Sequence, residues 1–298
     1  YQSLFLKAYY PLEYMVATMN NFGGFYSTEL YVHEARMHGG IIAAPCVNHS
    51  FNKASIQGKT IYLGFMFLRL LESIIIKKLL EERLKHGIYK SLDDFIDRVP
   101  VSVEQVSILI KINAFRFTGR NKRELLWEAH MKINKVSFEE HVITLFKTEK
   151  ITYQTPQLSC SALENAFDEI ELLGFALCSP FKLLVSPLKS TVKAKELMHY
   201  KGKTITIEGY LVTVKNTRTS TGKFMYFGTF LDREGDFIDT VHFPPAAAKY
   251  PFRGKGIYTI TGRVLEEFDC VNIEVISMLR LAIVEDPRYA DKPKTITV

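Results

Sequence analysis

The chain has 298 residues, enough for two or three domains, and its 47% hydrophobic and 23% charged residues are typical of a globular protein. No apolar run approaches the ~18–20 residues of a membrane-spanning helix, so we expect a soluble, cytoplasmic protein. Four isolated cysteines indicate neither a zinc site nor a disulfide framework: Cys46, Cys160, Cys178 and Cys270. Because the chain begins at Tyr1 without an initiator methionine, we interpret it as a fragment of a longer protein.

The first part of the chain predicts short helices separated by tight turns. Pro11 suits the first turn of a helix, and Ser27 suits an N-cap. Further helix starts are marked by Ser91, Ser102 and Asn121, each followed three residues later by an acidic or amide side chain. The expected elements are helices over 1–9, 11–19, 28–38, 69–86 and 122–133 and a short strand over 41–44.

The net charge of +6 is concentrated in this helical part. Its densest stretch contains five cations and no acid: Lys111, Arg116, Arg120, Lys122 and Arg123. Such clusters bind phosphate, and nearby helix N-termini add backbone N–H donors. The stretch therefore predicts a contact with a DNA backbone, and the alternative is a solvated positive loop.

The stretch from 203 to 281 predicts five short strands with the spacing of a small Greek-key barrel. Gly209 interrupts the alternation of the first strand, as a β-bulge would. The expected strands cover 203–214, 223–231, 237–243, 256–265 and 270–281, with a non-strand crossing over 244–252. This order is that of an OB-fold, which commonly holds single-stranded nucleic acid. The predicted fold is α+β, with an all-α helical region followed by a five-stranded OB-fold β-barrel.

The hairpin tip between the first two barrel strands carries candidate DNA ligands: Lys215, Arg218, Lys223, Phe224 and Tyr226. The two aromatic residues alternate with Met225 and Phe227, so we expect one pair to face inward and the other outward. An exposed ring would stack on a base, which is worth ~1–3 kcal/mol. The alternative is that these rings belong to the barrel core. Three acids in the turn over 266–269 would repel phosphate, so we do not expect the whole binding groove to attract nucleic acid.

A series of short motifs occurs in order along the chain: YQSLFLKAYYPLEYM at 1–15, EARM at 34–37, PCVNHSF at 45–51, YKSLDDF at 89–95, AF at 114–115, NKR at 121–123, LLGF at 172–175, LDREG at 231–235 and GRV at 262–264. This series resembles the alpha subunit of bacterial DNA polymerase III, the C-family replicative polymerase. The resemblance extends from Tyr1 to about Val284.

The resemblance implies five parts: the end of the fingers region over 1–60, a helix-hairpin-helix-like DNA-binding region over 61–135, a linker over 136–202, the OB domain over 203–284 and a tail over 285–298. The parent protein would be a Mg-dependent DNA-directed DNA polymerase. Its catalytic carboxylates belong to a palm domain that would precede Tyr1. We therefore expect no catalytic residue, metal or cofactor in this chain, and its part in the enzymatic reaction stays open.

Two departures from the family pattern affect the expected contacts. The family has a glycine-rich hairpin after the position of Gly64, but here no glycine occurs between Gly64 and Gly87. Side chains hinder the positive φ of such a turn, so we expect a weakened DNA grip. In the family's clamp-binding peptide, Leu145 and Phe146 match the apolar pair, but Val142 replaces the expected Gln. We expect this pair either to bind a sliding clamp or to anchor the linker to the core.

We therefore expect the DNA-binding C-terminal region of such a polymerase, positioning primer-template duplex and single-stranded template during replication. The alternative is a protein-interaction scaffold that docks the sliding clamp or the clamp loader with little direct DNA contact. An OB-type RNA binder is disfavoured by the N-terminal motifs. The sequence does not distinguish a main replicase from an error-prone relative.

Overall fold

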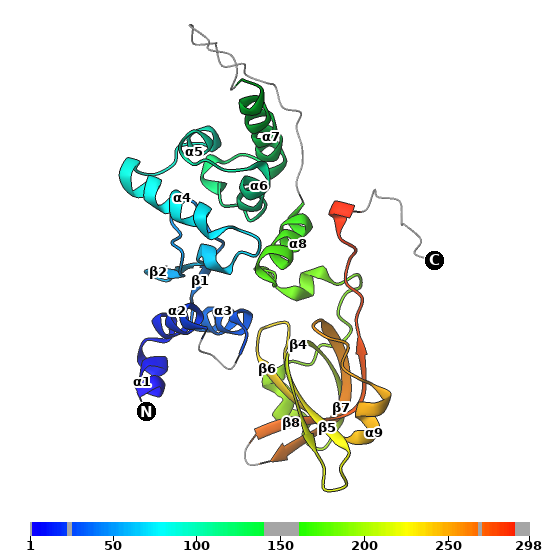
Figure 1. Ribbon diagram of the computed structural model, residues 1–298. Helices are drawn as coiled ribbons and strands as arrows, with labels where there is room; N and C mark the ends of the chain where they lie inside the picture. The colour runs from blue at the N-terminus through cyan, green and yellow to red at the C-terminus, as the bar shows by residue number, and fades with distance from the viewer. Residues whose placement is uncertain (1, 23–25, 140–160, 268–269, 290–298) are drawn as a thin grey trace. The chain divides into compact units, whose positions relative to one another are not determined.

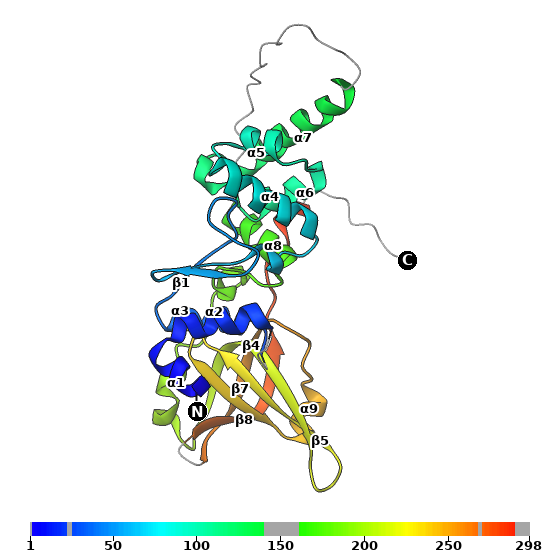
Figure 2. The ribbon, with the colours of Figure 1, turned by 60° about the vertical axis from the view of Figure 1, so that its left-hand side comes forward.

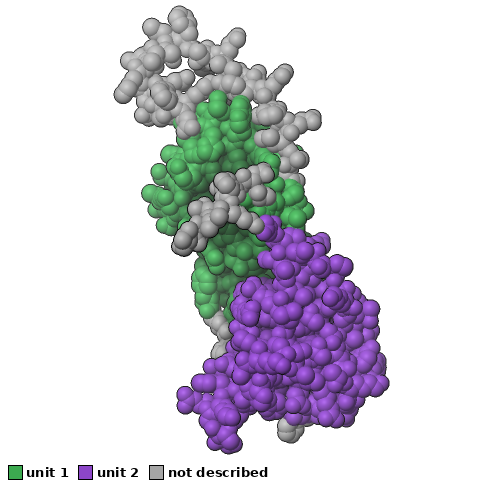
Figure 3. Space-filling model, turned by 90° about the vertical axis from the view of Figure 1, so that its right-hand side faces the viewer, with its two compact units in different colours: residues 1–177, 286–298 green, residues 178–285 purple. Residues whose placement is uncertain are grey.

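The computed structural model describes residues 2–22, 26–139, 161–267 and 270–289 (Figure 1). The chain forms two compact units, coloured separately in Figure 3. Unit 1 consists of Tyr1–Leu177 together with Asp286–Val298, and unit 2 of Cys178–Glu285. The chain thus leaves unit 1, builds unit 2 and then returns. Within the described ranges, no helix has both the length and the apolar character needed to cross a membrane.

Unit 1 is mostly helical and contains one small sheet. Its first helices are α1 (Gln2–Tyr9), α2 (Pro11–Asn21) and α3 (Thr28–Met37). The sheet has the order β1-β3-β2, with β1 (Ile41–Ala43) parallel and β2 (Ser55–Gln57) antiparallel to β3 (Thr60–Tyr62). The later helices are α4 (Ser73–His86), α5 (Leu92–Arg98), α6 (Val103–Lys111), α7 (Lys122–Glu139) and α8 (Ala162–Leu173). The sheet lies between the α2–α3 pair and α4 (Figures 1 and 2).

Local capping signals give several of these helix starts. The Ser91 Oγ accepts a hydrogen bond from the Asp94 amide at 3.1 Å, and the Ser102 Oγ accepts one from the Gln105 amide at 3.4 Å. Both predicted caps are confirmed, because such a cap involves only residues of the first turn. Ser27 precedes α3 as expected, but its side chain makes no capping hydrogen bond.

Two predicted helix boundaries were wrong. Helix α4 begins at Ser73 and not at position 69, because Leu70 adopts φ +67° and interrupts the helical backbone. Helix α7 continues to Glu139, beyond the expected end at 133, since no glycine or proline lies between Lys122 and Glu139 to stop it.

One hydrophobic core joins the elements of unit 1 from α2 to α8. Aromatic rings form its centre. Tyr89 meets Phe95 with ring centroids 5.0 Å apart, and Phe95 meets Phe115 at 5.1 Å, both edge to face. Each of these three residues is at most 1% exposed. This packing holds α5 and α6 in place and, with them, the helical turns that carry the basic cluster.

Unit 2 contains the predicted five-stranded barrel. Its elements are β4 (Thr204–Arg218), β5 (Phe224–Leu231), β6 (Phe237–His242), α9 (Pro244–Lys249), β7 (Ile257–Glu267) and β8 (Cys270–Arg280). The barrel is closed in the order β4-β5-β6-β8-β7, with β6 and β8 parallel. The first three strands form a meander and a helix separates the third from the fourth, so the OB-fold prediction is confirmed. The expected crossing over 244–252 contains the short helix α9.

The predicted bulge at Gly209 was wrong. The register between β4 and β5 shifts between Leu211 and Thr213, whereas Gly209 pairs regularly with Tyr258 on β7. Gly209 has a different role, because a Cβ there would lie 2.8 Å from the Phe230 Cβ. The missing side chain makes room for a core ring.

After the barrel, the chain returns to unit 1 and is held there by Arg288. Its guanidinium donates to Asp286 Oδ2 at 2.7 Å, to Asp168 Oδ1 at 2.8 Å and to a carboxylate oxygen of Glu171. Lys122 approaches the other oxygen of Asp168 at 3.2 Å. We call this group of five charged residues the Arg288 clasp. It ties α7 and α8 to the segment that follows the barrel.

Candidate nucleic-acid interface

The hairpin between β4 and β5 extends past the end of the barrel (Figures 1 and 2). Strand β4 continues to Arg218, four residues beyond the expected end. The turn is closed by a hydrogen bond from the Thr219 amide to the Lys223 carbonyl at 2.9 Å and contains Gly222 at φ +76°. No Asp or Glu occurs between Glu208 and Asp232. The hairpin's own sequence therefore contributes basic residues and no acid.

Aromatic rings line both faces of this hairpin. Phe224 contacts Tyr226 at 6.5 Å between ring centroids, and Tyr226 contacts Phe252 at 6.0 Å, next to the barrel core. This face is the inward one, yet Phe224 is 45% exposed because the hairpin extends beyond the barrel. On the opposite face, Phe227 is 43% exposed. The expected alternation of the side chains is present. Their exposure, however, depends both on the strand face and on how far the residue lies beyond the end of the barrel.

Arg218 lies against the exposed ring of Phe224. It lies directly opposite Phe224 in the strand pair, and its guanidinium carbon lies 5.1 Å from the ring centroid. A cation over an aromatic face fixes the ring and offers charge beside it. This arrangement joins a candidate stacking group to a candidate phosphate ligand. Lys215, Lys223 and Tyr226 lie on the same hairpin, and their DNA-binding roles stay predictions.

The cations of the helical cluster have partners within unit 1. Arg116 donates to the carbonyl oxygens of Pro45 at 3.1 Å and of Ala44 at 3.0 Å. Arg120 forms an ion pair with Glu128, and the pKa of Glu128 is nevertheless raised because burial disfavours its charged form. Arg116 thus ties the turn before α7 to the segment that follows β1, and Arg120 ties it to α7 itself.

The other three cations of the cluster reach acids on helix α8. The pairs are Lys111–Glu171 at 3.8 Å, Lys122–Asp168 at 3.2 Å and Arg123–Glu164 at 2.7 Å. Lys122 is buried and belongs to the Arg288 clasp, whereas Arg123 remains partly exposed. The positive charge of this stretch is therefore balanced by acids about 40 residues away in sequence or more. Phosphate binding by these five residues stays a prediction.

The first hairpin of the helix-hairpin-helix region was expected over 65–72, and these residues form the short 3-10 turn Phe65–Phe67 and the turn that leads into α4. The positive φ that we expected side chains to hinder is present at Leu70, at +67°. Two amides of this hairpin already have partners. The Arg69 N–H donates to the Leu172 carbonyl at 2.8 Å, and the Glu72 N–H donates to the Gln105 side chain at 2.9 Å. Neither is available to a phosphate.

Replacing Leu70 with glycine is expected to raise the free energy of unfolding of unit 1 by about 0.5–1 kcal/mol. The left-handed backbone costs a residue with a Cβ about 1–2 kcal/mol, and glycine offsets part of this gain through its greater freedom in the unfolded chain. The Leu70 side chain is 75% exposed, so little burial is lost. Urea unfolding followed by Trp127 fluorescence measures the change. A lower stability for Leu70→Gly would contradict the strain argument.

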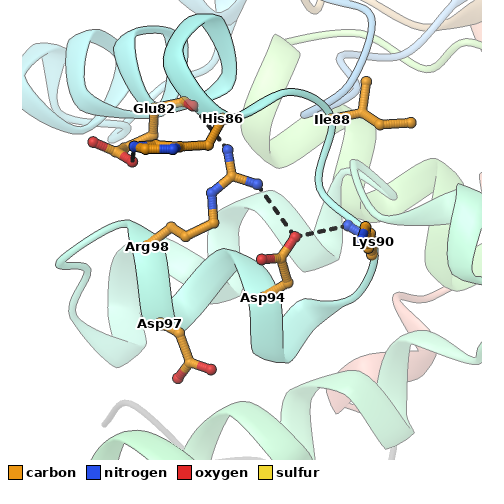
Figure 4. Close-up of a pocket in the computed structure, with 7 residues that line it drawn as sticks. All are labelled: Glu82, His86, Ile88, Lys90, Asp94, Asp97 and Arg98. Atoms are coloured by element: carbon orange, nitrogen blue, oxygen red, sulfur yellow. Dashed lines mark hydrogen bonds and ion pairs between the residues drawn. The ribbon is translucent and has the colours of Figure 1, made fainter.

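A pocket of about 500 Å³ lies between the end of α4 and α5 (Figure 4). Arg98 occupies its centre and donates to the carbonyl oxygens of Glu82 at 2.8 Å and Gly87 at 2.9 Å and to Asp94 at 3.2 Å. Its guanidinium also lies 4.3 Å from the Tyr89 ring centroid. Arg98 thereby ties the last turn of α4 and the following Gly87 to α5, so the pocket has a structural explanation.

The remaining candidates are the clamp-binding pair and a metal site. Leu145 and Phe146, the predicted clamp-binding pair, lie outside the described residues. Within the part of the chain that is described, no group of three or more His, Cys, Asp or Glu side chains could hold a metal ion.

Comparison with known proteins gives a helix-hairpin-helix match and several polymerase relatives. The family model described as a helix-hairpin-helix motif matches residues 39–125. The DNA polymerase III subunit alpha of Borreliella burgdorferi is 27% identical over 311 residues, which cover 95% of this chain and 27% of that protein. An error-prone DNA polymerase of Mycobacterium tuberculosis is 35% identical over 132 residues, or 43% of this chain and 12% of that protein. The chain thus spans about a quarter or less of these relatives.

Two solved structures each match less than a third of this chain. The second OB-fold domain of replication protein A from Methanococcus maripaludis matches 28% of this chain and 87% of its own, with 18% identity and a TM-score of 0.21. The mitochondrial single-stranded DNA binding protein Rim1 of S. cerevisiae matches 29% of this chain and 99% of its own, with 8% identity and a TM-score of 0.22.

Proposed function

We propose that this chain, which is homologous over most of its length to DNA polymerase III alpha subunits and error-prone DNA polymerases, handles DNA for such a polymerase. In this role the barrel holds single-stranded template through the β4–β5 hairpin, and the helical unit holds primer-template duplex. The work is positioning, and we assign no catalytic step to this chain.

The observation that carries this proposal is the β4–β5 hairpin itself. It combines basic residues from a stretch of sequence that contains no acid, two exposed aromatic rings and a position beyond the end of an OB barrel. Single-stranded nucleic acid presents a charged backbone and flat bases, so it complements both features. The Arg218–Phe224 pair places a phosphate ligand and a stacking surface together.

The test is fluorescence anisotropy of the chain with single-stranded and primed duplex DNA over a salt series. We expect log K to fall linearly with log salt. Arg218→Glu is expected to weaken single-strand binding roughly tenfold and to reduce the salt slope by about one, because it removes a phosphate contact and the cation beside Phe224. Lys203→Glu is the matched control, since Lys203 is exposed at the other end of β4. Equal losses in both variants, or binding that ignores salt, would refute the proposal.

A second candidate function is a scaffold that docks a sliding clamp or clamp loader. The observation that favours it is the internal pairing of the helical cations, which leaves less free charge for DNA than the sequence predicts. The same titration decides between the two, because a scaffold would not bind DNA at low salt. Charge reversal at Lys122 is unsuitable for this purpose, since it would break the Arg288 clasp.

A further inference from the structure

An exposed loop of unit 1, residues 49–53, has features that the proposed function does not use. Phe51 is 53% exposed, and His49, Asn52 and Lys53 are exposed as well. The loop lies between β1 and β2 of the small sheet and far in sequence from the barrel hairpin. We propose that this loop, together with Tyr62 on β3, is a second stacking surface for the unpaired bases of single-stranded DNA. The inference rests on the proposed function, because the ligand is the same strand.

The first argument is that both ends of the loop are held by paired hydrogen bonds. At the start, the Asn48 side chain donates to the Tyr89 carbonyl at 2.9 Å and accepts from the Tyr89 amide at 2.8 Å. At the end, the Asn20 side chain donates to the Ala54 carbonyl at 2.8 Å and accepts from the Ala54 amide at 2.7 Å. A loop fixed in this way loses little conformational entropy when it binds a ligand.

The middle of the loop is also fixed. The carbonyl oxygens of Phe51 and Asn52 accept hydrogen bonds from the amides of Phe65 and Met66, both at 3.0 Å. Gly64 allows this approach, since a Cβ at that position would lie 2.3 Å from the Asn52 carbonyl oxygen. The exposed side chains of the loop therefore project from a rigid backbone.

The second argument concerns the aromatic rings, each of which is supported by a protein group. The Arg83 guanidinium carbon lies 5.1 Å from the Phe51 ring centroid, and Arg83 is itself anchored to the Val47 carbonyl at 2.7 Å. The His49 ring stacks on Tyr62, with centroids 5.2 Å apart and planes inclined by 21°. Rings that are supported and exposed are suited to stack on a base.

The third argument is electrostatic. No Asp or Glu occurs between Glu34 and Glu72, a stretch that contains the loop and the whole small sheet. Lys53 and Lys59 are exposed there, and neither forms an ion pair with a residue that the structure describes. Most of the cations between Lys111 and Arg123 differ, because they pair with acids of unit 1. Charge without local compensation and supported rings together match single-stranded DNA better than an apolar protein partner.

The experiment measures binding of a labelled oligothymidylate to the full chain. We expect Phe51→Ala and His49→Ala each to weaken binding roughly tenfold, within the range for loss of one base–ring stack. Lys53→Glu, which changes only an exposed side chain, is expected to weaken it similarly. Phe5→Ala is the matched control, because Phe5 is an aromatic residue that is 56% exposed on α1, outside this loop. Circular dichroism checks that each variant folds.

Photocrosslinking with a 5-iodouracil-substituted strand, mapped by mass spectrometry, locates the contact. We expect crosslinks in the peptide that contains residues 49–53, and their loss in Phe51→Ala. If the loop variants bind as tightly as the unchanged chain while Arg218→Glu binds weakly, the inference is overturned and the proposed function stands. If the unchanged chain does not bind the strand at all, both are overturned.

Discussion

Replacing Arg288 with alanine is expected to lower the free energy of unfolding of unit 1 by about 3 kcal/mol, since it removes a partner from the buried Asp168 carboxylate in a partly buried ion group. Three carboxylates share this guanidinium, those of Asp168, Glu171 and Asp286. Asp168 is only 5% exposed and would retain Lys122 alone. The hydrogen bond to Asp286 raises the pKa of Arg288, so the cation is present at every accessible pH.

Two further variants separate the geometry of Arg288 from its charge. Arg288→Lys keeps the charge but loses the planar fork that reaches three acids, so we expect it to recover only part of the loss. Lys77→Ala removes an exposed i,i+4 pair with Glu81 and is expected to cost at most ~0.5 kcal/mol. The single Trp127, on α7, reports urea unfolding of unit 1 by fluorescence. If Arg288→Ala costs no more than Lys77→Ala, the clasp does not stabilise the fold.

Acidification from pH 7.5 to 5 is expected to remove about 2 kcal/mol of stability from the barrel through His242 alone. Burial lowers the pKa of His242 from 6.5 to about 4. Because the unfolded chain then binds a proton at a higher pH than the folded barrel, stability is complete above the unfolded pKa. It is lost as the pH falls from 6.5 toward 4.

The hydrogen-bond partners of His242 give burial its effect, because they leave no acceptor for a second proton in the part of the chain that the structure describes. The Thr240 hydroxyl donates to the Gly228 carbonyl at 2.8 Å, so its oxygen accepts from His242 Nε2 at 3.0 Å. The buried Nδ1 therefore carries no proton, and it has no hydrogen-bond partner among the described residues. Protonation would bury a new N–H without an acceptor, beside the Phe252 ring at 4.6 Å.

Hydrogen exchange of β5 and β6 peptides, corrected for the intrinsic pH dependence, measures the stability of the barrel. His242→Gln keeps an amide group near the Nε2 position but cannot titrate. We expect the unchanged chain to lose roughly 30-fold more protection than this variant between pH 7.5 and 5. Other acids titrate in both chains and cancel in the difference. Equal pH slopes in the two chains would rule out His242 as the cause.

The sequence by itself determined the elements that depend on local chemistry. The five barrel strands were predictable from alternating apolar residues and from turns such as the one containing Gly235, and the observed strands lie close to the expected ranges. The caps at Ser91 and Ser102 were predictable for the same reason, because each bond spans three residues. The aromatic and basic character of the β4–β5 hairpin was also readable, since its residues are neighbours in sequence.

Only the tertiary structure decided which of these groups are exposed and which charges are balanced. Lys122 belongs by sequence to a basic stretch, yet its partner Asp168 lies 46 residues further along the chain. Gly209 interrupts an alternating pattern, but its role depends on Phe230 from the next strand. The loop over 49–53 could have been noticed from the acid-free stretch around it, although its fixed ends depend on Asn20 and Tyr89. Local backbone preferences act over a few residues, whereas burial and charge pairing depend on distant segments that meet only in the folded chain.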